Sequence, residues 1–207
     1  MVAPQSSRES VFKDPRTLHP DYVPPEALFR ERELEELRAA QTGSTDKPAE
    51  YRRVFITGGY GLGKTLLARL YARTTRNDQQ TLYVNCIDCR GKVTFLLYRI
   101  INSFKPRFPH RGYSLYELRK TLANELRKDN GRILLIIDDL DMLLYESGLE
   151  GWESLQETLK LETLDSTLTL TLYTINHIDL LGRMGFLKKT LIERDPVSYT
   201  HLTLPTN

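Results

Sequence analysis

The chain has 207 residues, of which 40% are hydrophobic and 27% are charged, and these values are ordinary for a soluble globular protein with one domain. Its longest aliphatic run, Ile133–Ile137, is far shorter than the ~20 residues of a membrane-spanning helix, and the N-terminal residues lack a secretory signal pattern. The only cysteines, Cys86 and Cys89, do not make a disulfide framework. We therefore expect a cytoplasmic protein that does not contact a membrane.

The formal net charge is only +2, but the charge is unevenly distributed along the chain. Residues 90–132 contain eleven Lys or Arg and three acidic residues, whereas residues 133–165 contain nine acidic residues and one lysine. A basic block followed by an acidic one favours a polyanion on one surface and a metal or a basic partner near another. The alternative is a pair of solvated helix faces with no binding role.

In chain order, residues 1–49 are predicted to form a proline-bearing arm with an amphipathic helix, and residues 50–196 a base domain. The expected helices are 26–41, 64–74, 93–104, 114–128 and 151–161, and the expected strands are 53–57, 81–85, 132–141 and 166–176. Strands that alternate with helices predict a parallel sheet with helices on both faces.

The stretch GGYGLGKT, Gly58 to Thr65, fits the P-loop pattern G-x-x-x-x-G-K-[ST], or Walker A motif, and lies between a predicted strand and a predicted helix. Its glycines let the backbone N–H groups surround phosphates, and the dipole of the following helix favours a bound anion. We expect Lys64 to reach the β- and γ-phosphates of ATP and Thr65 to ligate Mg²⁺. The candidate residues are Gly58, Gly59, Tyr60, Gly61, Leu62, Gly63, Lys64, Thr65 and Leu66.

Two acidic residues follow the apolar strand ILLII, where a P-loop protein needs a Walker B carboxylate for its metal ion. Asp138 is placed to hold Mg²⁺ with Thr65, and Asp139 to orient or deprotonate the attacking water. Asn176 ends the next strand, as does the residue called sensor 1 in AAA+ ATPases, and would contact both the water and the γ-phosphate. Asp139, Asn176 and Lys64 are therefore the candidate catalytic residues of an ATPase that converts ATP and water to ADP and phosphate.

Several stretches resemble the archaeal origin-recognition and cell-division-control initiators, a family of AAA+ ATPases. SVFKDPRTLHPDYVPPEALFRERELEEL resembles the N-terminal arm of that family, YVNCIDCRGKVTFLLYRIINSF the region after its second strand, and LTLYTINHIDLL its sensor 1 strand. The resemblance covers about residues 10–195. It implies a three-layer αβα P-loop domain of the α/β class, in which Tyr22, Val23, Pro24 and Arg30 lie against the adenine.

The same resemblance implies a replication initiator that binds double-stranded origin DNA and uses ATP as a conformational switch. The family carries an extra helix that touches DNA within the region that is basic in this chain, and Lys105, Arg107 and Arg111 are the candidate DNA contacts. The resemblance also suggests a replicative helicase or further copies of the chain as protein partners. It suggests a nucleoid-associated location within the cytoplasm.

The chain departs from the family pattern in several respects. The family usually has glutamate where Asp139 stands, and the shorter side chain predicts slow hydrolysis. No arginine finger can be assigned, because Lys188 and Lys189 occupy its region and Arg194 comes late. We expect the sheet to be truncated before its fifth strand, and the helical lid and winged helix to be absent. Residues 197–206 resemble a translated sequencing adapter, so we interpret 197–207 as an artefactual tail and expect the native protein to continue beyond about residue 196.

Three other functions remain as alternatives. A signalling or transposition-helper ATPase would act on protein partners, and a P-loop kinase would phosphorylate a small metabolite. The chain could also be a truncated ATPase that does not fold stably alone. Cys86 and Cys89 have the C-x-x-C spacing of zinc or redox sites, but no second cysteine pair accompanies them.

Overall fold

The computed structural model describes residues 14–19, 22–25, 29–42, 52–128, 132–159, 168–177 and 199–204. The helices are α1 (Glu31–Thr42), α2 (Lys64–Thr74), α3 (Val93–Phe104), α4 (Leu115–Lys128) and α5 (Leu140–Leu159), with 3-10 turns at Pro15–Leu18 and Cys86–Cys89. The strands are β1 (Arg52–Thr57), β2 (Gln80–Asn85), β3 (Ile133–Asp138), β4 (Leu168–Ile175) and β5 (Tyr199–Thr203). Residues 43–51, between α1 and β1, lie outside the described residues, as does the region of Lys188, Lys189 and Arg194.

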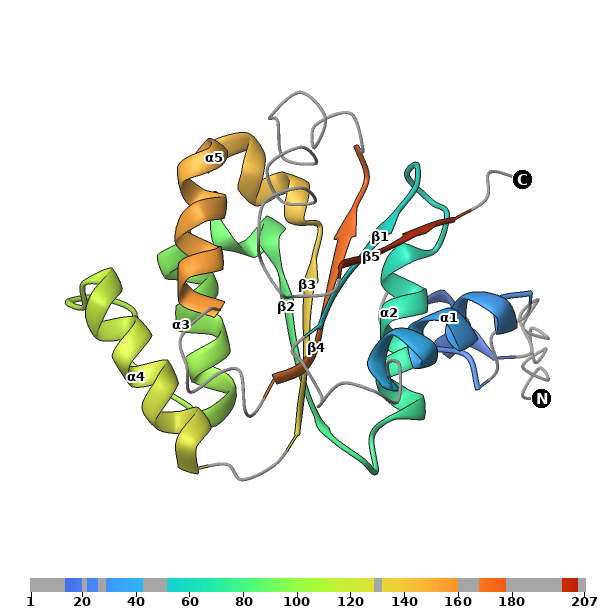
Figure 1. Cartoon of the computed structure of the whole chain (residues 1–207), viewed down its shortest axis with the longest axis horizontal. Coiled ribbons are helices and arrows are strands. Elements are labelled where there is room, and N and C mark those ends of the chain that lie inside the picture. Colours follow the sequence, from blue (N-terminus) through green and yellow to red (C-terminus); the bar gives the residue numbers. More distant parts are fainter. Residues whose placement is uncertain are drawn as a thin grey trace, which may run out of the picture.

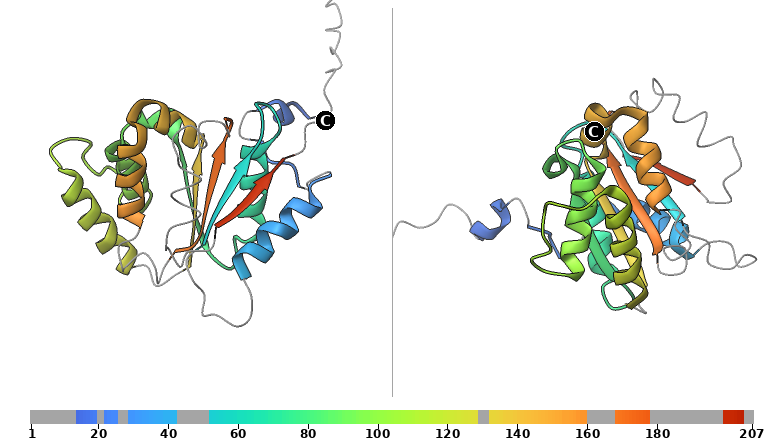
Figure 2. Two further views of the ribbon diagram at one scale, coloured as in Figure 1. Left: turned by 45° about the horizontal axis from the view of Figure 1, so that its top comes forward. Right: turned by 90° about the vertical axis from the view of Figure 1, so that its left-hand side faces the viewer.

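The strands form one parallel sheet in the order β2-β3-β4-β1-β5. Helices α3 and α5 cover one face of this sheet with α4 packed against α3 on the same side, and α1 and α2 cover the other face (Figures 1 and 2). The α/β class and the three-layer αβα arrangement predicted from the sequence are confirmed.

The central strand β3 explains why the sheet needs helices on both sides. All six of its residues are buried, and successive side chains point to opposite faces. Ile133, Leu135 and Ile137 pack into the core beneath α3, α4 and α5, whereas Leu134 and Ile136 pack into the core beneath α1 and α2. A strand buried on both faces is therefore a continuous apolar run, as this sequence has.

The expectation that the sheet ends before a fifth strand is wrong. Tyr199–Thr203 pairs in parallel with β1, and Leu202 and Leu204 are buried in the core beneath α1 and α2. Alternating threonine and leucine favours a strand, and the outer edge of β1 offers backbone groups for pairing. The interpretation of 197–207 as an appended tail concerns the origin of these residues and stays a prediction.

Helix α5 begins eleven residues earlier than expected, at Leu140 rather than at 151. The sequence interpretation extended the preceding strand to 141, but β3 ends at Asp138 and Asp139 turns the chain with a φ of 52°. Leu140, Leu143 and Leu144 then recur with helical spacing and are buried. Gly148, with a φ of 61°, kinks the helix before its second half.

Candidate nucleotide-binding site

The P-loop joins β1 to α2 and depends on glycine at positions with a left-handed backbone. Gly61 has a φ of 77° and Gly63, which caps the N-terminus of α2, has a φ of 82°. A Cβ atom at either position would meet nothing within 4 Å, so backbone conformation and not space requires the missing side chain. The loop therefore carries the chain into α2 with Lys64 as its first helical residue.

Lys64 is held over the loop that precedes it. Its Nζ donates hydrogen bonds to the carbonyl oxygens of Gly58 and Gly59, at 3.0 and 2.7 Å. Only 5% of the residue is exposed, and burial lowers the pKa of its ammonium group. An ammonium group with carbonyl partners is placed to exchange them for phosphate oxygens, which are stronger acceptors.

Asp138 is fully buried at the end of β3 and accepts hydrogen bonds from three other elements. The donors are Thr65 Oγ1 from α2 at 3.0 Å, Tyr83 Oη at 2.6 Å and Asn85 Nδ2 at 3.4 Å from β2, and Thr174 Oγ1 from β4. Burial and the hydrogen bond to Asp138 raise the pKa of Tyr83 to about 12, so its hydroxyl remains a donor even well above neutral pH. The predicted pair of Asp138 and Thr65 is thus in direct contact.

Asp139 lies between two amide donors. Asn176 Nδ2 donates to its Oδ1 at 3.0 Å, and Asn85 Nδ2 donates to its Oδ2 at 2.9 Å. The backbone N–H of Asp139 donates to Thr174 Oγ1 at 2.8 Å, although the residue has a positive φ. Such a conformation is costly for a residue other than glycine, and it persists where surrounding contacts hold it.

Asn176 is anchored in turn by Asp141, at the start of α5. Its side-chain amide lies 3.3 Å from both carboxylate oxygens of Asp141, and Asp141 is fully buried. The predicted sensor 1 residue is therefore fixed by an acidic group on the helix that follows Asp139.

A cavity of about 450 Å³ brings most of these residues together. Its lining comprises Tyr22, Tyr60, Gly61, Gly63, Lys64, Thr65, Leu66, Arg69, Asp139 and Asn176. Nine of these ten were candidates from the sequence; Arg69 was not. The P-loop, Asp139 directly after β3 and Asn176 directly after β4 thus converge on one space large enough for a small ligand.

The N-terminal arm lies against α2 and the P-loop. Arg73 Nη1 donates to the carbonyl oxygens of Val23 and Pro24, both at 3.3 Å. Arg30 donates to the carbonyl oxygen of Leu62 at 3.1 Å and pairs with Glu33 at 2.6 Å. Of the four candidate adenine contacts, only Tyr22 lines the cavity, and the adenine role of all four stays a prediction.

Residues 50–180 match the family model of the AAA domain. The chain belongs to this family. The ORC1-type DNA replication protein 2 of Sulfurisphaera tokodaii is 27% identical over 148 residues, which cover 68% of this chain and 35% of that protein. The chain thus spans about a third of the length of the curated relatives that it matches, and the predicted resemblance to archaeal initiators is confirmed over this part.

Solved structures share the fold of this AAA domain. The ORC2 protein of Aeropyrum pernix, in ADPNP-ADP complexes, aligns with a TM-score of 0.74 at 22% identity, over 95% of this chain and 52% of that chain. The ORC1 protein of the same organism, in complex with DNA, aligns with a TM-score of 0.65 at 24% identity, over 92% and 48%. At these identities the likeness shows the fold alone.

The sequence interpretation missed three residues of the AAA domain that form hydrogen bonds with Asp138 or Asp139. Tyr83 and Asn85 are two positions apart on β2, and Thr174 lies on β4. All three therefore come from the strands that flank β3. The register pairs Asn85 with Asp138. Polar residues at the carboxyl end of a predicted strand were the available signal, because the ends of parallel strands meet at one edge of the sheet.

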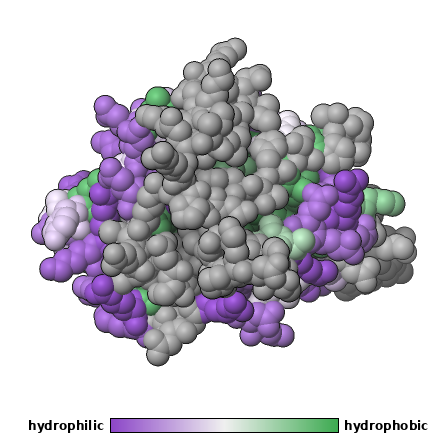
Figure 3. Space-filling view, in the orientation of Figure 1, coloured by the Kyte–Doolittle hydropathy of each residue, from purple (hydrophilic) through white to green (hydrophobic). Residues whose placement is uncertain are grey.

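The three candidate DNA contacts lie in the connection between α3 and α4. Lys105, Arg107 and Arg111 are all exposed, whereas Phe108 between them is buried and anchors the connection to the core. The N–H of Phe108 donates to Asn102 Oδ1 at 3.1 Å. Figure 3 shows hydrophilic side chains over the side of the molecule on which α4 lies. The role of Lys105, Arg107 and Arg111 in binding DNA stays a prediction.

The described part of the AAA domain offers no separate metal centre. Among its residues, no group of three or more His, Cys, Asp or Glu side chains could hold a metal ion. Cys86 and Cys89, at the two ends of the 3-10 turn after β2, are both buried in the core. The structure also describes no helix that is both long and apolar enough to cross a bilayer.

Proposed function

We propose that this chain binds ATP with Mg²⁺ and acts on double-stranded origin DNA as part of a replication initiator, with ATP as a conformational switch. The observation that carries the proposal is the cavity in which Lys64 and Thr65 of the P-loop face Asp139 and Asn176. The residues to which we assign phosphate binding and those to which we assign the positioning of water thus line the same cavity. The ORC2 protein in ADPNP-ADP complexes, which has the same fold, supports nucleotide as the ligand.

The residues at this site suit the ligand that the proposal requires. Lys64 would turn from the carbonyl oxygens of Gly58 and Gly59 to the phosphates. Thr65 and Asp138, 3.0 Å apart, present the hydroxyl and carboxylate oxygens that bind Mg²⁺ together with phosphate oxygens. The cation would neutralise part of the phosphate charge.

Slow hydrolysis follows from the surroundings of Asp139. Each of its carboxylate oxygens accepts a hydrogen bond from an asparagine, so an attacking water must compete with Asn85 and Asn176. Its side chain is also one methylene shorter than the usual glutamate. A nucleotide that turns over slowly can hold one conformation long enough to act as a switch.

The α3–α4 connection supports DNA as the partner. Lys105, Arg107 and Arg111 are exposed there, and such cations bind the phosphate backbone without reading bases. The ORC1 protein in complex with DNA has the same fold. A replicative helicase or further copies of the chain as partners, and a cytoplasmic, nucleoid-associated location, belong to the same proposal.

Duplex binding with different nucleotides tests the proposal. Fluorescence anisotropy with a labelled duplex is recorded for the chain with a non-hydrolysable ATP analogue, with ADP and without nucleotide. We expect the affinity to differ by about fivefold or more between the analogue and ADP, the usual size of a coupling between two sites. Equal affinities would remove the switch. Nucleotide binding without any duplex binding would favour the signalling or transposition-helper alternative.

A further inference from the structure

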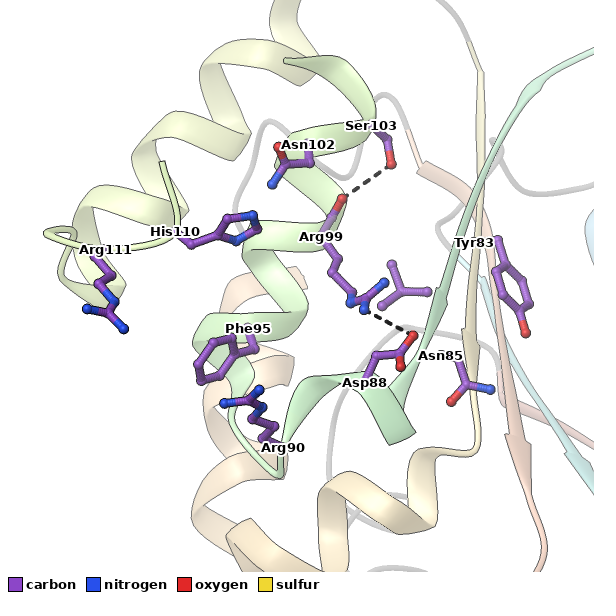
Figure 4. A pocket seen from close by; sticks show the side chains of 11 residues that line it. Tyr83, Asn85, Asp88, Arg90, Phe95, Arg99, Asn102, Ser103, His110 and Arg111 are labelled. Atoms are coloured by element: carbon purple, nitrogen blue, oxygen red, sulfur yellow. Dashed lines mark hydrogen bonds and ion pairs between the residues drawn. The ribbon is translucent and has the colours of Figure 1, made fainter. Parts of the chain in front are cut away.

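A second cavity of about 710 Å³ lies outside the nucleotide site, along the exposed side of α3. It shares no lining residue with the nucleotide cavity. One wall is β2, an edge strand of the described sheet, and the other wall is α3 with the connection that follows it (Figure 4). We call this cavity the α3 groove.

Arginines outnumber acidic residues among the charged side chains that line the α3 groove. Arg90, Arg99 and Arg111 all contribute to it, whereas Asp88 is its only acidic residue. The guanidinium group of Arg90 lies over the ring of Phe95, 5.9 Å from the ring centroid, and the backbone of Arg90 has a φ of 47°. Arginine has a planar fork of donors that matches phosphate oxygens, so this lining suits a phosphate group better than a neutral ligand.

The one acid in the groove is held by a bond that is easily exchanged. Arg99 Nη2 lies 3.0 Å from Asp88 Oδ2, and about half of each side chain is exposed to solvent (Figure 4). Ion pairs that are this exposed contribute little to stability, because water screens them. An incoming phosphate can therefore take the place of Asp88 beside Arg99 at small cost.

We propose that the α3 groove binds the sugar–phosphate backbone of DNA, as a second phosphate site apart from the P-loop. This inference rests on the proposed function, because it assigns further contacts to the same duplex. Arg111 belongs both to the groove and to the α3–α4 connection, so one strand can pass from the connection into the groove. The cavity is too small to admit a duplex, but it can seat the phosphate ridge of one strand.

Two substitutions at the Arg99–Asp88 ion pair, which change the net charge in opposite directions, test the proposal. Arg99→Gln removes a phosphate contact, so duplex affinity falls about threefold to tenfold and the slope of log affinity against log salt decreases by about 1. Asp88→Asn frees Arg99 and removes a repulsive charge, so affinity rises about twofold to fivefold. Both are measured by anisotropy over a range of salt concentrations, and thermal melting verifies that each variant is folded.

An exposed ion pair on the other side of the sheet provides the matched control. Arg32 Nε lies 3.0 Å from Glu36 Oε1 on α1, so Arg32→Gln and Glu36→Gln make the same changes in net charge far from the groove (Figure 1). These two variants should change duplex affinity by less than about twofold, as expected for charges beyond a Debye length from the bound DNA.

Each other outcome overturns the inference in a distinguishable way. Equal changes in duplex affinity for the Arg99 and Asp88 variants and for the Arg32 and Glu36 variants would mean that only net charge matters. Normal binding by wild type with no effect of Arg99→Gln or Asp88→Asn would remove the groove but leave the proposed function intact. Absence of duplex binding by wild type at low salt would overturn the proposed function and this inference together. Binding of polyglutamate that depends on Arg99, with duplex binding that does not, would assign the groove to an acidic protein segment.

Discussion

The nucleotide cavity and the α3 groove both present charged side chains to a phosphate ligand, but they hold these side chains differently. At the nucleotide site, Lys64 and Asp138 are buried; Lys64 donates to two carbonyl oxygens of the P-loop, and Asp138 accepts hydrogen bonds from three other elements. In the groove, Arg99 and Asp88 are half exposed and pair only weakly. The effect of a buried charge depends on the positions of its hydrogen-bond partners. The effect of an exposed charge is a longer-range attraction that salt screens. Substitutions in the cavity should therefore have large, local effects, and those on the basic surface smaller effects that depend on salt.

The largest effect is expected for Lys64→Ala. The variant loses the ammonium group that would bind the phosphates, so ATP affinity falls at least about 100-fold, equivalent to about 3 kcal/mol for a charge-assisted bond. Isothermal titration calorimetry with ATP and Mg²⁺ measures this. Lys128→Ala, which removes an exposed lysine that pairs with Glu125, is the control and should bind normally. Unchanged binding by Lys64→Ala would contradict the P-loop assignment.

Asp139→Asn separates binding from hydrolysis within the same cavity. The variant keeps the size of the side chain but loses the carboxylate that positions or deprotonates water, so hydrolysis slows about 100-fold or more. ATP affinity stays within about threefold, because Asp138 and Thr65 are untouched. Phosphate release under single-turnover conditions measures the rate, with Glu150→Gln on α5 as the control. An unaltered rate would remove Asp139 from catalysis.

On the basic surface, charge reversal should give a graded effect. Arg107→Glu combined with Arg111→Glu weakens duplex binding about 10-fold to 100-fold at low salt and reduces the salt slope by about 2. Anisotropy at several salt concentrations measures both quantities. Arg32→Glu with Arg38→Glu on α1 makes the same change in net charge. If the two double variants behave alike, the basic block is only a solvated face.

The smallest effect is expected for Tyr83→Phe, which removes one of the donors to Asp138. Thr65 and Thr174 still donate to this carboxylate, so the free energy of unfolding decreases by about 1 kcal/mol, the usual contribution of one hydrogen bond. Urea denaturation measures the loss. Tyr116→Phe, at a residue that is 72% exposed, should leave stability unchanged. If Tyr83→Phe and Tyr116→Phe have the same free energy of unfolding, the hydrogen bond from Tyr83 to Asp138 does not contribute to stability.

Some features of this protein were determined by the sequence alone because they depend on residues that are close together in the chain. The spacing of glycines before Lys64 specifies a phosphate loop, and the apolar run before Asp138 specifies a strand buried on both faces. The structure confirms both elements and places Asp139 and Asn176 in one cavity with residues of the P-loop. The start of α5 was missed although Leu140 to Leu144 carry the signal, because Asp139 breaks the strand with a backbone conformation that its residue type does not reveal.

Only the tertiary structure decided which side chains surround the acids. The bond from Thr65 to Asp138 spans 73 positions, and that from Asn85 to Asp139 spans 54. Asn85 reaches Asp139 because the sheet order places β2 beside β3, and Thr65 reaches Asp138 because α2 packs over β3 and β4. No local pattern encodes either arrangement. The pairing of β5 with β1 and the α3 groove depend in the same way on neighbours that are distant in sequence, so periodicity and spacing could predict neither.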